Sequence, residues 1–175
     1  MSLEGRRVAV LAEEAYQELE FWYPVMRLRE EGADVVVAAP RAGCAYESFL
    51  GYPLLAEKAI DELDPAALDA VVIPGGEAGT RLQDSSAAIS LVRRLSERGA
   101  ITAAISSGSA VLAGAGALSG RRATGDDALA QQLGEAGATY AEGQGVVADG
   151  PVITARATDD LPMFFRSIRQ ALQAK

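Results

Sequence analysis

The feature that most constrains this chain is a series of short apolar runs, most of them followed by a stretch with helical spacing. Four runs each contain four or five aliphatic side chains close together: RVAVLA (7–12), VVVAAP (35–40), DAVVIPGG (69–76) and AITAAIS (100–106). Runs of this kind are typical of strands that are buried on both faces of a parallel sheet. The alternation therefore predicts an α/β protein in which helices cover both faces of a mainly parallel sheet.

Stretches with helical spacing complete the alternation. The predicted helices are 16–32, 85–99, 109–118, 126–137 and 159–173. Proline inside a helix removes a backbone hydrogen bond, so Pro24 predicts a kink or a late start in the first of them. The segment 41–60 is interpreted as irregular or as a hairpin, and 146–155 as a hairpin that turns at Asp149-Gly150. Because there is no repeat and no long linker, residues 1–175 are expected to form one domain.

The charge balance narrows the classes of partner. The chain has 24 acidic and 16 basic side chains, which gives a net charge of −8. A protein needs clustered cations to displace counterions from nucleic-acid phosphates or to approach an anionic membrane, so neither partner is expected. The stretch 100–119, which lies within the longest run without a charged residue, is rich in small residues and breaks at Gly108, which argues against a membrane span. The N-terminal residues lack the pattern of a secretory signal, and the expected location is the cytoplasm.

Two absences restrict the chemistry. The chain contains no histidine, so it cannot supply a Ser-His-Asp triad or a histidine metal site. Its only cysteine, Cys44, excludes an intramolecular disulfide and a multi-cysteine metal site, and no metal or cofactor is predicted. Cys44 is interpreted as a small buried or interface residue, with redox sensing as the alternative. Lysine occurs only at Lys58 and Lys175, which leaves little scope for a Ser-Lys pair.

The ends of the predicted strands are where a ligand site is expected. In parallel sheets, ligands bind beyond the carboxyl ends of the strands. Ser106 follows one such strand at a turn into a helix, where its side chain would be exposed and the Ser107 amide would face an oxyanion. The alternative is a serine that caps the helix. Gly75 and Gly76 end another strand, where their amides would bind a ligand or the two glycines would form a simple tight turn.

Charged side chains near the same strand ends have two interpretations each. Most of the acidic residues after the first strand are expected on a solvated helix face, while one of them would point inward as a general acid or base. The members of this group are Glu13, Glu14, Glu18 and Glu20. Asp126 and Asp127 are expected to cap a helix. Arg156 would bind a carboxylate or phosphate, or would form a structural ion pair.

Taken together, these segments resemble the ThiJ/PfpI superfamily, which includes PfpI-type intracellular proteases and deglycases with a class I glutamine amidotransferase-like fold. The resemblance extends over nearly the whole chain. It rests on E-x-x-x-P at Glu20 and Pro24, RLREEGADV (27–35), VVIPGG (71–76), AAISSGSAVLAGAGALSGRR (103–122), and VVADG and ITAR within 146–156. It implies a flavodoxin-like three-layer sandwich, a homodimer or higher homo-oligomer, and a small-molecule site at the strand ends.

In the pattern of that superfamily, the elbow reads A-x-C-H-G-P or A-x-C-A-G-P, with a cysteine thiolate held near a glutamate. Here Ser106 stands at the cysteine position, Ser107 at the histidine or alanine, and Ser109 at the proline. The resemblance implies Glu20 as the partner carboxylate and the amides of Gly76 and Ser107 as the oxyanion hole. Because Ser107 and Ser109 also depart from the pattern, natural divergence explains Ser106 better than an engineered replacement does.

Serine at this position changes the chemistry. Its hydroxyl is far less acidic than a thiol and needs an adjacent base, and a carboxylate with an ordinary pKa of about 4.3 is a feeble one. One hypothesis is a protein that has lost thiol catalysis and acts through binding or in stress response. The other is an enzyme. It would be a hydrolase with Ser106 as nucleophile and Glu20 as base, or a glyoxalase- or deglycase-like enzyme in which Glu20 shuttles a proton.

An oligomer contact is the second kind of site that the sequence suggests. Phe49 and Leu50 are adjacent large apolar side chains within the segment 41–60, which has no clear amphipathic pattern. Apolar side chains that stay exposed in one chain commonly mark a contact with another. We therefore expect Phe49 and Leu50 to belong to the contact between copies.

Overall fold

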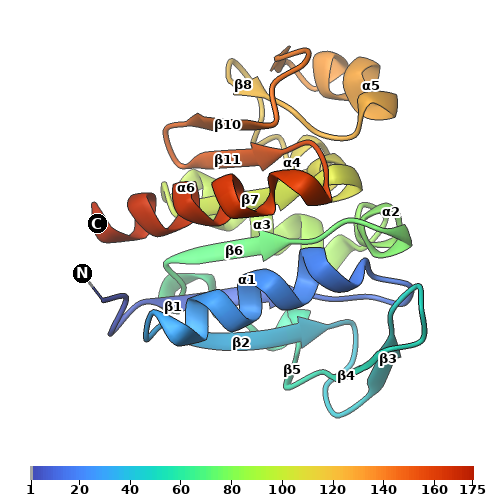
Figure 1. Ribbon diagram of the computed structural model, residues 1–175, viewed down its shortest axis with the longest axis vertical. Helices are drawn as coiled ribbons and strands as arrows, with labels where there is room; N and C mark the ends of the chain where they lie inside the picture. Colours follow the sequence, from blue (N-terminus) through green and yellow to red (C-terminus); the bar gives the residue numbers. More distant parts are fainter. Residues whose placement is uncertain (1) are drawn as a thin grey trace.

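Figure 1 shows the computed structural model of the chain, which describes residues 2–175. A seven-stranded sheet runs through the middle in the order β10-β11-β7-β6-β1-β2-β5. Its strands are β1 (Arg7–Leu11), β2 (Asp34–Ala39), β5 (Lys58–Ala59), β6 (Ala70–Ile73), β7 (Ile101–Ile105), β10 (Val146–Asp149) and β11 (Val152–Ala155). Neighbouring strands are parallel except for the β10–β11 hairpin, which is antiparallel. The predicted mainly parallel sheet is confirmed.

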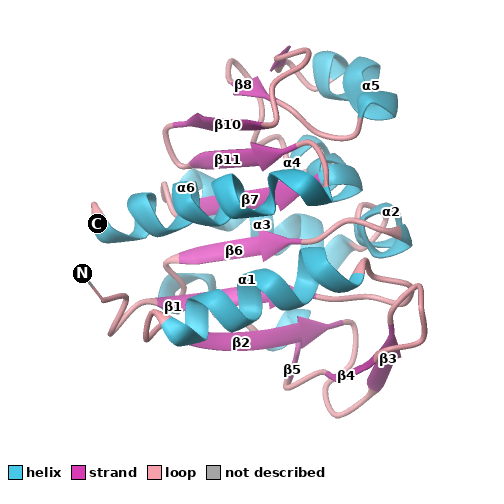
Figure 2. Cartoon of the chain, in the orientation of Figure 1, coloured by secondary structure: helices cyan, strands magenta, loops and turns pink. Residues whose placement is uncertain are grey.

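Helices lie on both faces of the sheet, as Figure 2 shows. Helices α1 (Glu18–Glu30) and α6 (Leu161–Gln173) share one face, and α3 (Ser86–Glu97) and α4 (Ser109–Gly114) cover the other. The short helix α2 (Glu77–Leu82) follows β6. The short helix α5 (Ala130–Glu135) precedes the β10–β11 hairpin. The chain is thus a three-layer α/β sandwich, as predicted.

Alternation along β1 explains the two cores. In β1, Val8 and Val10 belong to the core under α1 and α6, whereas Ala9 and Leu11 belong to the core under α3 and α4. Successive side chains of a strand point to opposite faces, so a strand that is covered on both faces must be apolar throughout. This requirement is the physical reason for the continuous apolar runs in the sequence.

The first helix differs from its prediction at Pro24. It begins at Glu18, where the Gln17 side chain accepts the backbone N–H of Glu20 at 2.8 Å, and it continues through Pro24 to Glu30. The late start that Pro24 suggested is therefore wrong. The cap at Gln17 satisfies one of the free amides of the first turn, and contacts of Phe21, Val25 and Leu28 with the core hold the helix across the missing bond.

Several other helices and strands differ from their predicted boundaries. The predicted helix 109–118 ends at Gly114 and is preceded by a single 3₁₀ turn over 106–108. Helix α2 was not predicted, and the predicted helix 126–137 is a 3₁₀ turn followed by the short α5. The segment 41–60 contains the hairpin β3 (Ala45–Glu47) and β4 (Pro53–Leu55) and then β5. Sequence analysis missed the two-residue pair β8 (Arg122–Ala123) and β9 (Thr139–Tyr140). Within residues 2–175, no helix combines the length and the apolar character that a bilayer crossing needs.

Candidate functional site

The carboxyl ends of four parallel strands meet at one edge of the sheet and form the candidate site. Strands β1, β6, β7 and β11 lead into the segments that carry Glu20, Gly75, Ser106 and Thr158. An open cavity of about 350 Å³ lies there. It is lined by Glu20, Ser106, Asp126, Asp127, Arg156, Ala157 and Thr158. The structure therefore brings the predicted Ser106, Glu20 and Arg156 to one cavity.

Ser106 has a strained backbone. Its φ is +54°, in the left-handed region that residues with a side chain rarely adopt. Such a conformation costs about 1–3 kcal/mol and persists only where the surroundings hold it in place. Here a Cβ on Gly108 would lie 2.6 Å from the Ile73 carbonyl oxygen, and one on Gly79 would lie 2.6 Å from the Gly108 nitrogen. Close packing of the turn against β6 and α2 thus maintains the elbow.

Gly75 is the point where Glu20 and Ser106 approach each other. A Cβ on Gly75 would collide with Glu20 Oε2 and would lie 2.8 Å from the Cβ of Ser106. The N–H of Gly75 donates to Glu20 Oε2 at 2.9 Å. This amide, for which the sequence suggested a role in ligand binding, therefore holds the carboxyl group. Because Gly75 has no side chain, the Glu20 carboxyl group and Ser106 can approach each other beside it.

Glu20 is a buried carboxyl group at the cavity wall. Its side chain reaches inward from the first turn of α1, and the residue is only 3% exposed. While Oε2 accepts the Gly75 amide, Oε1 accepts the hydroxyl of Thr158 at 2.8 Å. Burial raises the pKa of Glu20, the two hydrogen bonds lower it, the charge of Asp126 raises it, and the net pKa lies above the ordinary value. A carboxyl group with a raised pKa is better suited to accept and return a proton near neutral pH.

The remaining acidic residues after β1 have structural contacts. Glu18 Oε1 accepts the N–H of Leu50 at 2.6 Å, and Glu14 Oε1 accepts the N–H of Glu47 at 3.3 Å. The Glu13 carboxylate accepts the N–H of Glu14 at 2.8 Å. Of the four residues that the sequence singled out, Glu20 is the one that borders the cavity.

The two predicted oxyanion positions lie beside the elbow. Gly76 has a φ of +79° at the start of α2, and a Cβ there would lie 2.6 Å from the Gln17 nitrogen. The Ser107 hydroxyl donates to the Gly76 carbonyl oxygen at 2.7 Å. Ser107 therefore ties the elbow to α2 through its side chain. Ser109 is buried and donates to the Thr124 carbonyl oxygen at 3.2 Å.

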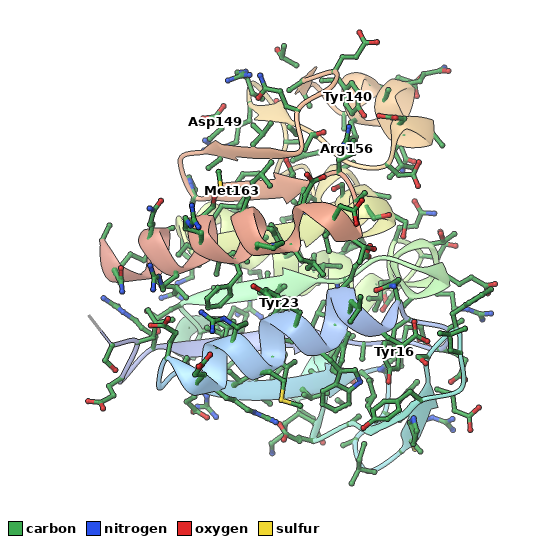
Figure 3. All side chains as sticks on the ribbon, viewed as in Figure 1. Tyr16, Tyr23, Tyr140, Asp149, Arg156 and Met163 are labelled. Carbon is green, nitrogen blue, oxygen red and sulfur yellow. The ribbon has the colours of Figure 1, made fainter. Side chains whose placement is uncertain are left out.

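Arg156 follows β11 directly and borders two cavities. It lines the Ser106 cavity and also an adjoining one of about 540 Å³ with Asp127 and Tyr140. Figure 3 shows Arg156 and Tyr140 at the same end of the molecule. The Arg156 Nε lies 3.6 Å from Asp160 Oδ2, so the structure contains the ion pair that was the alternative to a ligand contact. Asp126 caps the turn 127–129 by accepting the N–H of Ala128 at 3.0 Å, as predicted.

Thr158 is the site residue that sequence reasoning missed. It stands 138 positions from Glu20 in the chain, and an isolated threonine in a loop carries no pattern that would mark it.

Among residues 2–175, no three His, Cys, Asp or Glu side chains gather in a way that would hold a metal ion. The polar groups that line the cavity are the hydroxyls of Ser106 and Thr158, the buried carboxyl group of Glu20, and the charged side chains of Asp126, Asp127 and Arg156.

The raised pKa of Glu20 predicts a pH dependence of stability. The folded protein binds the Glu20 proton more tightly than the unfolded chain does, so this contribution is full below the unfolded pKa and disappears as pH rises through the folded pKa. The free energy of unfolding of the wild type, relative to Glu20→Gln, should therefore be higher near pH 4 than near pH 8. The difference is about 1.4 kcal/mol for each unit by which the pKa is raised. Urea unfolding at several pH values measures it, and a difference that does not change with pH would contradict the shift.

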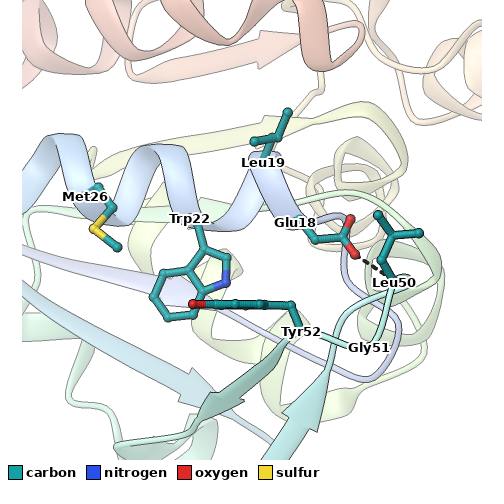
Figure 4. A pocket seen from close by; sticks show the side chains of 7 residues that line it. All are labelled: Glu18, Leu19, Trp22, Met26, Leu50, Gly51 and Tyr52. Atoms are coloured by element: carbon teal, nitrogen blue, oxygen red, sulfur yellow. Dashed lines mark hydrogen bonds between the residues drawn. The ribbon is translucent and has the colours of Figure 1, made fainter.

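A separate apolar cavity lies on α1 and the β3–β4 hairpin (Figure 4). It has a volume of about 500 Å³ and is lined by Glu18, Leu19, Trp22, Met26, Leu50, Gly51 and Tyr52. The Trp22 and Tyr52 rings meet edge to face with centroids 5.8 Å apart. Leu50 is 80% exposed and Phe49 is 71% exposed, so the two residues expected at an oligomer contact are at the surface. Cys44 is half-buried and packs against the core.

Comparison with known proteins agrees with this architecture. The sequence profile of the DJ-1/PfpI family matches residues 6–171. An uncharacterized protein of Archaeoglobus fulgidus is 38% identical over 158 residues, which cover 90% of this chain and 93% of that protein. A deglycase of Thermococcus kodakarensis is 32% identical over 167 residues, which cover 95% and 99%. The crystal structure of Drosophila melanogaster DJ-1beta has a TM-score of 0.90 at 28% identity and covers 100% of this chain and 92% of that one. The chain therefore belongs to the DJ-1/PfpI family and has its flavodoxin-like α/β fold.

Proposed function

We propose that the strand-end cavity binds small carbonyl compounds and that Glu20 transfers a proton on them. In this proposal Ser106 is a hydrogen-bonding partner of the substrate and does not act as a nucleophile. The observation that carries the proposal is the position of Glu20, a nearly completely buried carboxyl group that borders a cavity beside Ser106. Its raised pKa allows both protonation states to be used.

The chain's composition disfavours the thiol and serine routes. Ser106 replaces the sulfur that the family pattern would place at the elbow, and the chain has no histidine to activate a hydroxyl. Glu20 borders the same cavity as Ser106, and a carboxylate is a weak base for the hydroxyl of a serine. Removing a local base typically forfeits a factor of about 10²–10⁴ in rate.

The proposed step is a proton transfer next to a carbonyl group. The Glu20 carboxylate takes a proton from the carbon adjacent to the substrate carbonyl, and the C–H electron pair forms the carbon–carbon double bond of an enolate. The charge that develops on the carbonyl oxygen is stabilised by donors at the elbow, for which the Ser106 hydroxyl is suited. Glu20 then returns the proton to a neighbouring atom of the substrate. The deglycase name of the relative from Thermococcus kodakarensis supports a substrate with a carbonyl-derived group.

Isomerisation of small 2-hydroxyaldehydes and 2-hydroxyketones tests the proposal, because the carbon between their hydroxyl and carbonyl groups carries the proton that Glu20 would take, and the proton returns to the former carbonyl carbon. Glu20→Gln keeps the shape of the side chain and removes the proton-accepting oxygen, so it should lower the rate at least about a hundredfold. Ser106→Ala should lower it less, about tenfold, because it removes one hydrogen bond. Glu97→Gln, an exposed glutamate at the end of α3, serves as the control and should match the wild type. Equal rates for Glu20→Gln and wild type would sink the proposal, and a wild type without any turnover would indicate a cavity that only binds.

A serine hydrolase is the second candidate, and the strained backbone of Ser106 is the observation that favours it. Strain of this kind presents nucleophiles at the elbows of other α/β enzymes. A fluorophosphonate reacts with activated serines, so intact-mass analysis and peptide mapping distinguish the two candidates. Our proposal predicts no adduct on Ser106. A stoichiometric adduct that disappears after denaturation would support the hydrolase.

We also propose that the apolar cavity on α1 is a contact between two copies of this chain. Among residues 2–175, six of the seven exposed large apolar side chains belong to α1 or the segment 49–55: Leu19, Met26, Phe49, Leu50, Tyr52 and Leu55. The acidic Glu18 is in the first turn of α1 and the basic Arg29 is in its last turn, whereas Arg27 lies over the Phe165 ring of α6. Two α1 helices packed antiparallel about a two-fold axis would therefore place opposite charges side by side. An isologous contact requires this kind of self-complementarity.

Sedimentation velocity tests the contact. The wild type is expected to sediment as a dimer, and Met26→Glu should sediment as a monomer because two carboxylates would be buried close together. Met163→Glu places the same charge at an equally exposed methionine on α6, outside the cavity, and should remain dimeric. A monomeric wild type, or a Met26→Glu variant that remains dimeric, would contradict the proposal.

A further inference from the structure

Thr158 makes a contact that the proposed proton transfer does not by itself explain. Its hydroxyl donates to Glu20 Oε1 at 2.8 Å, although the residues belong to opposite ends of the chain. The Gly75 amide holds the other oxygen, Oε2, at 2.9 Å. A Cβ placed on Gly75 would collide with Oε2 and would also lie close to the Ser106 Cβ, so Oε2 and Ser106 border the same space beside Gly75. Each carboxyl oxygen therefore has its own donor, and the pair fixes which oxygen faces Ser106.

The two donors differ in one chemical property. An amide N–H can only donate, whereas a hydroxyl can rotate and accept a hydrogen bond instead. When Glu20 is ionised, Thr158 donates to it. When Glu20 carries a proton on Oε1, Thr158 can accept that proton's hydrogen bond and turn its own O–H toward the cavity, which it lines. A buried carboxyl group with this partner is satisfied in both protonation states, so neither state carries the penalty of an unpaired polar group.

We propose that Thr158 is a positioning residue for Glu20: it orients Oε2 toward Ser106 and balances the two protonation states of the carboxyl group. The inference rests on the proposed role of Glu20. Other charged groups also face this carboxyl group across the cavity. Asp126 and Asp127 come from the turn before α5, and Arg156 comes from the end of β11, where it is paired with Asp160. Thr158 is distinguished from them by direct contact with the carboxylate.

Two variants separate the hydroxyl from the rest of the side chain. Thr158→Val has nearly the same shape and lacks the hydroxyl, while Thr158→Ser keeps it. In protein labelled with ¹³C at the glutamate carboxyl carbons, the Glu20 resonance is assigned by its absence from Glu20→Gln. Its titration midpoint should rise by about one pH unit in Thr158→Val, because the hydrogen bond that the hydroxyl donates to the ionised carboxylate is stronger than the one it accepts from the protonated group. The midpoint should stay near the wild-type value in Thr158→Ser. Thr139→Val, an exposed threonine of β9, is the control for the substitution itself.

Kinetics provides the second measurement. The pH profile of carbonyl turnover should shift in the same direction in Thr158→Val, with kcat about tenfold lower at neutral pH and KM unchanged, and Thr158→Ser should restore both. A midpoint that does not move in a folded Thr158→Val protein would overturn the inference. If no protein in the series turns over substrate, the proposed function fails, yet the NMR midpoint still decides whether Thr158 controls Glu20. If Thr158→Val does not fold, Thr158→Ala takes its place in the same titration.

Discussion

Replacing Gly75 by alanine is expected to abolish carbonyl turnover and to destabilise the protein. The new methyl group would occupy the point where Glu20 Oε2 and the Ser106 Cβ meet, and it would also lie 3.2 Å from the Ile105 carbonyl oxygen. Glu20 would have to move away from both Ser106 and the Gly75 amide. Added methyl groups in packed interiors typically cost about 1–3 kcal/mol. Displacement of a catalytic group by about 1 Å can cost a hundredfold in rate.

Urea unfolding and turnover measure the two effects on the same sample. Gly134→Ala is the matched control, because nothing lies within 4 Å of a Cβ placed there and the residue is inside α5. Since alanine favours a helix over glycine by about 1 kcal/mol, this control should be as stable as the wild type or more so, with unchanged turnover. Wild-type turnover by Gly75→Ala would show that the approach of Glu20 to Ser106 has no role in the chemistry.

Replacing Ser106 by cysteine is expected to create a highly reactive thiol. The elbow would present the sulfur at the first residue of the 3₁₀ turn that leads into α4. The dipoles at the start of a helical turn favour the ionised form of a cysteine. The pKa of the new thiol should therefore lie below the value of about 8.5 for free cysteine. At pH 7 we expect iodoacetamide to alkylate it at least tenfold faster than it alkylates Cys44.

The alkylation rate of the thiol at position 106 is compared with the rates of two other thiols. Cys44 is present in every sample, is half-buried and packs against the core. Ser107→Cys shifts the thiol by one residue to a side chain that is directed at the Gly76 carbonyl oxygen on α2, and it should react slowly. Mass spectrometry of tryptic peptides measures the three rates. If the cysteine at 106 reacts no faster than Cys44, the elbow does not provide the environment that the account assigns to it.

The sheet was predictable because its physical cause is local. A strand covered on both faces must be apolar throughout, and the runs around β1, β2, β6 and β7 carry that mark in consecutive residues. The hairpin over 146–155 was predictable because its turn signal is local, although its turn residues are Gly150 and Pro151, one position later than the predicted Asp149-Gly150. Helix α2 was missed because six residues beginning at a glycine-rich turn are too few to establish a helical period.

The candidate site was predictable only in part. Glu20, Ser106 and Arg156 were identified because strand ends and the family pattern mark them, and the structure brings them to one cavity. The role of Gly75 depends on its distances to Glu20 and Ser106, which cannot be inferred from the spacing of these residues in the sequence. Thr158 reaches Glu20 across 138 positions, and the pKa of Glu20 depends on burial by the whole fold. Such contacts are set by tertiary packing, which the local pattern does not determine.

Deuterium exchange at carbon tests the central claim most directly, because it detects proton transfer whether or not a product is released. Dihydroxyacetone is incubated with the protein in D₂O, and NMR follows the loss of protons from the carbon next to the carbonyl group. The account predicts exchange well above the buffer rate for the wild type, reduced exchange for Ser106→Ala, and the buffer rate for Glu20→Gln. Exchange by Glu20→Gln at the wild-type rate would contradict it.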